Sequence, residues 1–74
     1  MVAERLKLLR KRNNVKQTDV SPMLGVTTRN YQRYEAGEIE PNIDSLIALA
    51  DYFGVSLDYL VGRSDNPNMN NERT

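Results

Sequence analysis

Residues 17–37 read QTDVSPMLGVTTRNYQRYEAG, and two glycines divide this stretch into two short segments of helical pattern. The first segment, 17–24, carries three apolar residues and is followed at once by Gly25, which is typical of a tight turn with a left-handed residue. The second segment starts with Thr27, a residue type that caps helices, runs to about residue 36 and ends at Gly37. The pattern predicts two short helices joined by a glycine turn.

The flanking sequence predicts three further helices. Apolar residues at positions 2, 6 and 9 mark a helix over 2–12. Asn42 caps a helix that repeats apolar residues until Gly54, and Ser56 caps a short helix over 57–61 that stops at Gly62. Short connections between five helices indicate a compact all-α domain over residues 1–62. Residues 63–74 contain four Asn and one apolar residue, so we expect a disordered tail there.

Length and composition exclude several classes of protein. Seventy-four residues make one domain, and without Cys or His the chain has no disulfide, thiolate nucleophile, imidazole base or ordinary transition-metal site. We therefore expect no enzyme, no bound metal and no cofactor. The longest apolar run, Leu46 to Ala50, is far too short to cross a membrane, and a cytoplasmic protein is expected.

Charge is balanced in total but not along the chain. Residues 1–16 hold six basic side chains against one acidic, a balance of +5, whereas residues 38–62 hold five acidic and no basic ones, a balance of −5. If the two segments form different faces, the basic face can lie against phosphates. The plainer explanation is a set of solvated helix faces.

The paired segments meet the demands of a helix-turn-helix. Such a motif needs a small residue where the helices cross, a glycine in the turn and apolar residues on both sides of the angle. Ser21 and Gly25 fill the first two places. The bracing residues are Val20, Leu24, Val26, Tyr31 and Tyr34.

The second helix of this motif has two different sides. At about 100° per residue, Thr28, Arg29, Gln32 and Arg33 fall in one arc of roughly 140°, opposite Tyr31. Arginine matches the edge of guanine, glutamine that of adenine, and a threonine methyl can meet thymine. One such polar side alone is more often a solvated surface. Its occurrence with a basic first helix, within 37 residues, favours DNA recognition.

At this point the sequence resembles the Cro-like phage-repressor (Xre-type) helix-turn-helix family. The resemblance is carried by ERLKLLRKRNNVKQTDV at 4–20, LGVTTRNYQRYEAGEIEPNIDSLIALADYFGV at 24–55 and SLDYLVGRSD at 56–65. It implies a DNA-binding domain of the lambda-repressor-like fold. By this likeness Thr28, Arg29, Gln32 and Arg33 read bases, and Gln17 and Thr27 contact phosphate and backbone. Lys7 and Arg12 of the basic segment are expected to contact phosphate, and Arg10 and Glu35 match a pair that bridges the first and third helices.

Three positions depart from the family pattern. Ala36 stands where an asparagine commonly contacts phosphate, and Lys16 replaces the usual hydroxyl cap. Pro22 leaves two possibilities open. Either it lies inside a helix that begins at Gln17, or the helix begins late with Ser21 as its cap, which would remove Gln17 from the helix N-terminus.

Two functions follow as hypotheses. The first is a sequence-specific regulator of double-stranded DNA, a repressor in particular; the second is an antitoxin or adaptor-type protein-interaction module with secondary DNA binding. A weak homodimer is expected through the helices over 43–53 and 57–61, with Leu57 and Leu60 mainly inside and Tyr59 and Val61 partly exposed. Two-fold symmetry then requires an inverted-repeat operator with half-sites about 34 Å apart.

Overall fold

Five helices make up the part of the chain that the structure, a computed structural model, describes, namely residues 2–67. They are α1 (Val2–Arg12), α2 (Gln17–Leu24), α3 (Thr28–Ala36), α4 (Ile43–Phe53) and α5 (Leu57–Leu60), and no strand occurs within residues 2–67. The predicted all-α fold and its five helices are confirmed. None of these helices is long and apolar enough to cross a membrane.

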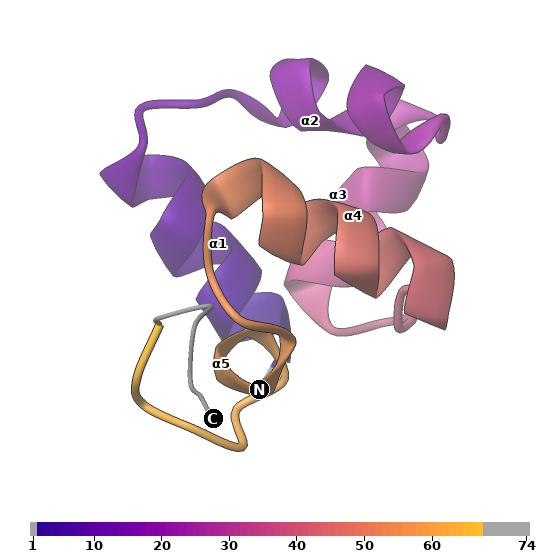
Figure 1. The fold of residues 1–74 in the computed structure, drawn as a ribbon. Coiled ribbons are helices and arrows are strands. Elements are labelled where there is room, and N and C mark those ends of the chain that lie inside the picture. Colours follow the sequence, from indigo (N-terminus) through magenta and orange to yellow (C-terminus); the bar gives the residue numbers. More distant parts are fainter. Residues whose placement is uncertain (1, 68–74) are drawn as a thin grey trace.

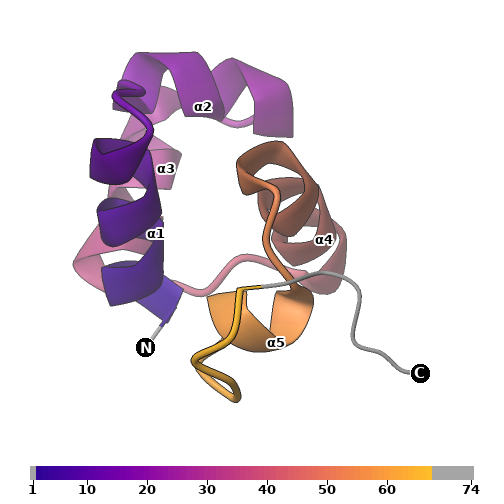
Figure 2. The ribbon, with the colours of Figure 1, turned by 60° about the vertical axis from the view of Figure 1, so that its left-hand side comes forward.

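The helices enclose one core. α1 and α4 lie on opposite sides of the domain, α2 crosses above them, and α5 closes the other end (Figures 1 and 2). α3 packs against both α1 and α2. Side chains from every helix meet in the centre, and the fully buried apolar ones are Leu6, Leu9, Val20, Tyr31, Leu49 and Leu60. This packing holds α3 by one side and leaves the other side outside.

The start of α2 resolves the two possibilities that Pro22 left open. α2 begins at Gln17, so the late start with Ser21 as its cap is wrong. The Asp19 carboxylate accepts a hydrogen bond of 2.9 Å from the Lys16 backbone N–H, as the third residue of a helix does in a capping box, while the Asp19 N–H turns to the Lys16 carbonyl at 2.9 Å because no hydroxyl is present at position 16. Pro22 has no backbone N–H, so the Thr18 carbonyl four residues earlier lacks its helical donor. Both residues are exposed, so water can bind that carbonyl instead.

The turn between α2 and α3 has the features that the sequence predicted. Gly25 has φ 71°, in the left-handed region, and Val26 N–H returns to the Ser21 carbonyl at 3.1 Å. Ser21 is 2% exposed at the crossing of the two helices. The predicted braces are buried or partly buried around it: Val20, Leu24, Val26, Tyr31 and Tyr34.

The region around α5 differs from expectation. Tyr59 is 6% exposed as part of the buried core cluster, and the Arg5 guanidinium, which pairs with Asp65 at 2.9 Å, lies 4.0 Å above its ring. The expected partly exposed Tyr59 is therefore wrong. Leu60 is buried and Val61 half-buried, as predicted, whereas Leu57, which was expected mainly inside, is only half-buried.

The segment expected to form a tail returns to the domain over its described part. The Pro67 carbonyl accepts a hydrogen bond of 2.9 Å from the Ser56 N–H, and Arg63 and Ser64 N–H groups donate to the Asp58 carbonyl. These bonds hold residues 63–67 against α5. The rest of the predicted tail, 68–74, lies outside the described residues, and a domain boundary after residue 62 stays a prediction.

Candidate nucleic-acid interface

The exposed side of α3 is polar and carries two guanidinium groups. Arg29, Gln32 and Arg33 are exposed, whereas Tyr31 and Tyr34 on the opposite side are buried with their rings edge to face. Within residues 2–67, the Arg29 side chain makes no hydrogen bond or ion pair, so its five guanidinium N–H donors are free for an outside acceptor. Three of the four predicted base-reading residues thus share one surface.

The single carboxylate of α3 does not face this surface. Glu35 is 4% exposed and lies between α3 and α1. Arg10 holds it through two bonds, from Nε to Oε2 at 2.7 Å and from Nη2 to Oε1 at 3.1 Å. Arg10 also donates to the Val15 carbonyl at 3.2 Å. The two residues predicted to bridge the first and third helices therefore form a forked ion pair.

The pKa values of this pair show which effects dominate. Burial acts to raise the pKa of Glu35, but hydrogen bonds from Arg10 and Gln17, the nearby Tyr31 hydroxyl and the charge of Arg10 outweigh it and leave the pKa below the ordinary value. The hydrogen bonds to Glu35, together with the charge of Glu35, raise the pKa of Arg10 above its ordinary value in spite of its partial burial. Glu35 is consequently ionised at neutral pH, and its charge is neutralised by Arg10.

Gln17 joins this ion pair to the exposed side of α3. Its Nε2 donates to Glu35 Oε1 at 3.1 Å, and its Oε1 accepts from Gln32 Nε2 at 3.2 Å. Gln17 is the first residue of α2 and is half-buried. Sequence reasoning assigned it a phosphate contact but missed both side-chain partners, because these come from a helix that approaches only in the folded chain.

The two threonines at the start of α3 have different surroundings. Thr27 is exposed and caps α3, with its Oγ1 accepting from the Asn30 N–H at 3.1 Å, so its hydroxyl proton stays available for an outside acceptor. Thr28 is half-buried, and its hydroxyl lies 2.9 Å from that of buried Ser21. The Thr28 hydroxyl is thus engaged in the helix crossing, whereas the side chains of Arg29, Gln32 and Arg33 lie on the exposed side of α3.

A hollow of about 420 Å³ lies at the C-terminal end of this surface, lined by Arg29, Gln32, Arg33, Ala36 and Glu38. Ala36, where the family pattern commonly has asparagine, contributes no polar group to it. Glu38 was not among the predicted site residues. Its Oε1 accepts a hydrogen bond from Arg33 Nε at 3.4 Å, and both side chains are about half exposed.

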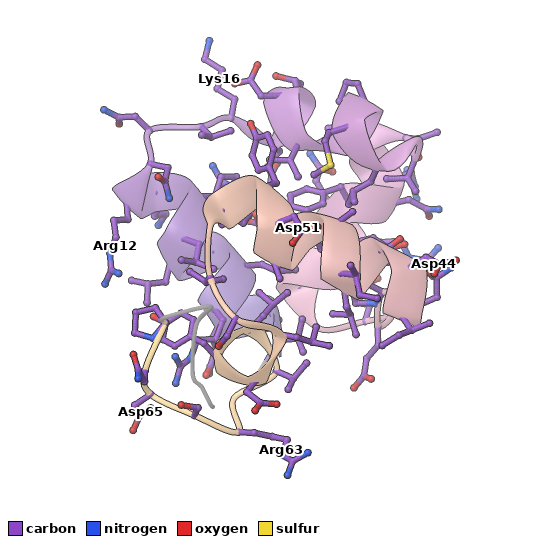
Figure 3. The ribbon with its side chains drawn as sticks, in the orientation of Figure 1. Arg12, Lys16, Asp44, Asp51, Arg63 and Asp65 are labelled. Atoms are coloured by element: carbon purple, nitrogen blue, oxygen red, sulfur yellow. The ribbon has the colours of Figure 1, made fainter. Side chains whose placement is uncertain are left out.

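The predicted phosphate contacts on α1 separate in the structure. Arg10 lies on the side of α1 that faces α3, where it bonds to Glu35, and Arg5 lies on the side that faces α5, where it contacts Tyr59. Lys7 lies about 60° from Arg10 around the helix, whereas Arg12 lies about 20° from Arg5. Arg12 extends outward at the end of α1, away from the rest of the domain (Figure 3). Lys7 is therefore grouped with α3, and Arg12 is not.

Two exposed acidic side chains lie on another helix. Asp44 and Asp51 are exposed on α4, which lies in front of α3 in the view of Figures 1 and 3. These two carboxylates of the acidic segment 38–62 therefore lie on a different helix from Arg29 and Arg33, whereas Glu38 of the same segment lies beside Arg33.

Comparison with known proteins agrees with this geometry. The family model described as helix-turn-helix matches residues 6–60, so the chain belongs to this helix-turn-helix family, of the Xre type that its sequence resembles. The chain is 34% identical over 73 residues to YobD, an uncharacterized HTH-type transcriptional regulator of Bacillus subtilis, covering 99% of this chain and 65% of that protein.

Two solved structures are similar. A transcriptional regulator from Listeria innocua has a TM-score of 0.81 at 42% identity, over 84% of this chain and 58% of that one. The DNA-binding domain of the P22 C2 repressor has a TM-score of 0.76 at 33% identity, over 82% of this chain and 80% of that one. The chain thus spans less than two thirds of the length of the B. subtilis and Listeria proteins.

Proposed function

We propose that this protein is a sequence-specific, double-stranded-DNA-binding transcriptional regulator, a repressor, that places α3 in the major groove. The observation that carries the proposal is the two-sided character of α3. Its one carboxylate, Glu35, is buried and neutralised by Arg10, whereas Arg29 and Arg33 extend from the exposed side. A guanidinium matches guanine O6 and N7, which are the acceptors that the major groove displays.

Phosphate contacts would fix the position of α3. Thr27 retains a hydroxyl proton at the N-terminus of α3, where the helix dipole also favours an anion. Lys7, beside α3 on α1, supplies a mobile cation. Such contacts add affinity for any duplex but carry no sequence information directly.

The test is selection of bound sites from a random duplex pool, repeated with Arg29→Ala, Arg33→Ala and the control Arg63→Ala. Arg63 has the same charge and extends into solvent beyond α5 (Figure 3). Each α3 variant should lose preference at particular base pairs, at a cost of about 1–3 kcal/mol in affinity for the best site. Arg63→Ala should keep the selected sequence. Unchanged sequence preference in both α3 variants contradicts the proposal.

We also propose that two copies bind an inverted repeat with half-sites about 34 Å apart. One α3 offers few base-reading side chains, and a second copy on the next turn of DNA multiplies the affinity. Since Tyr59 is buried, the expected contact reduces to the half-buried Val61 and Leu57. Footprinting with sedimentation at saturation tests this, and one protein on an asymmetric half-site contradicts it.

A further inference from the structure

We propose that Glu38 is a specificity-determining residue that orients Arg33 toward a guanine. The inference rests on the proposed function and adds to it a residue outside α3. Glu38 lies just beyond the glycine that ends α3, and its side chain returns to the hollow that Arg29, Gln32 and Arg33 line.

The backbone fixes where Glu38 lies. Gly37 has φ 77°, in the left-handed region, and this conformation turns the chain back over the last turn of α3. The Glu38 N–H then donates to the Arg33 carbonyl at 3.0 Å, while the Glu38 carboxylate accepts from Arg33 Nε at 3.4 Å. The two residues are thus joined twice, once through the backbone and once through side chains, and the backbone bond keeps the main chain of Glu38 beside Arg33.

The geometry of the side-chain bond leaves the useful part of the guanidinium unoccupied. Glu38 engages Nε, and within residues 2–67 the two terminal nitrogens of Arg33 have no partner. Those nitrogens can donate together to guanine O6 and N7. An arginine held at Nε also loses less side-chain freedom on binding than one that is free in solution.

The charge of Glu38 also discriminates between occupants of the hollow. A phosphate beside Arg33 would be repelled by the carboxylate, whereas a guanine edge offers two neutral acceptors. Glu38 therefore favours a base edge over the DNA backbone at this position. The exposed ion pair contributes little in water, but it strengthens when DNA excludes solvent from around it.

Arg29 provides the internal comparison. It lines the same hollow and carries the same guanidinium, but it makes no hydrogen bond or ion pair within the described residues. Loss of Glu38 should therefore affect the base pair that Arg33 reads and spare the one that Arg29 reads. Glu40 is the matched control carboxylate, since it is exposed in the same loop and is not paired with Arg33.

The experiment measures affinity for the selected site and for its single-base variants, with wild type, Arg33→Ala, Glu38→Ala and Glu40→Gln. Arg33→Ala identifies the guanine position by removing a preference of about 5- to 150-fold there. Glu38→Ala should lower the preference at that position by about three- to tenfold and leave the Arg29 position unchanged. Glu40→Gln should leave both unchanged, and all variants should keep the wild-type denaturation midpoint, since exposed pairs stabilise little.

The outcomes separate this inference from the function on which it rests. If wild type selects no sequence at all, the proposed function is wrong and the role of Glu38 with it. If wild type selects a site but Glu38→Ala keeps the full guanine preference, or lowers the preference at every position alike, the role of Glu38 alone is wrong. The same holds if Arg33→Ala loses preference at no position.

Discussion

The Arg10–Glu35 pair makes a prediction in which the two partners are not equivalent. The Glu35 side chain is 3% exposed and that of Arg10 is 16% exposed, so Arg10 can reach water and Glu35 cannot. In Arg10→Met, Glu35 stays buried with Gln17 as its remaining hydrogen-bond donor. Removal of one partner from a buried pair costs about 3–5 kcal/mol. In Glu35→Gln, Arg10 keeps the Val15 carbonyl and access to solvent, and a loss of about 1–2 kcal/mol is expected.

These losses are large for a chain of this length, whose free energy of unfolding is about 4–11 kcal/mol at the usual stability per residue. The assay is urea unfolding followed by circular dichroism, for both single variants and the double variant Arg10→Met with Glu35→Gln. The double variant should lose less than the sum of the single losses, because no uncompensated charge remains. Arg10→Lys serves as the milder variant, since it keeps the charge and loses the fork.

Acid provides a second test of the same pair. In wild type the pKa of Glu35 lies below the unfolded value of 4.5, so its contribution to stability is complete above that pH and is lost as the pH falls through the lowered pKa. In Arg10→Met burial acts without its counterion and raises the pKa of Glu35, so the penalty should shrink as the pH falls and the carboxyl takes a proton. Additive losses at neutral pH, or a penalty that does not shrink in acid, would refute this reasoning.

Three further substitutions test the placement of other residues. Lys7→Ala should weaken binding to all duplexes alike and reduce the salt dependence of affinity, whereas Arg12→Ala should change the affinity and its salt dependence less. The measurement is titration of duplex DNA at several salt concentrations. Equal effects of the two substitutions would contradict the grouping of Lys7 with α3. Tyr31→Phe removes a buried hydroxyl that meets no acceptor at hydrogen-bonding distance and angle but lies near enough to Glu35 to help lower its pKa. The free energy of unfolding should therefore fall by less than about 1 kcal/mol, and a larger loss would show that the hydroxyl is fully bonded to the carboxylate. Gly37→Ala should cost about 1–2 kcal/mol in the free energy of unfolding, because a φ of 77° is unfavourable for a residue with a side chain. A clash adds nothing to this loss, since the nearest side-chain atom, at 3.8 Å, leaves room for the methyl group. If the substitution costs nothing, the backbone is not strained at this position.

The helices could be predicted from the sequence because their ends are encoded locally. Thr27 and Asn42 accept hydrogen bonds from the third residue of their helices, and Gly25 and Gly37 take left-handed conformations that end theirs. Each signal acts within a few residues of the end that it sets. The start of α2 was ambiguous because Lys16, which precedes it, does not cap the helix with its side chain, and the bond found there runs from the Lys16 backbone N–H to Asp19. Pro22 offered a competing local signal.

The parts of the site that the sequence did not predict depend on contacts between distant residues. Tyr59 packs in the core, and Arg5, 54 positions away in the chain, lies over its ring; no local pattern predicts this long-range contact. The periodicity of α1 gives the angle between Lys7 and Arg12, but not which edge faces α3. Glu38 lies outside the helical period of α3, and its contact with Arg33 depends on the turn at Gly37.

The buried ion pair also determines which side of α3 is exposed. Around a helix, Arg33 lies about 160° from Glu35 and Arg29 about 120° from it, so anchoring Glu35 to α1 directs both arginines outward. Gln32 lies only about 60° from Glu35, which places it where Gln17 can bond to both. A rotation of α3 that moved Arg33 off the surface would have to break the Arg10 bonds and expose Tyr31 or Tyr34. The polar network and the core therefore oppose the same displacement, and Arg10, which lies outside the exposed side of α3, holds the arginines of that side in position.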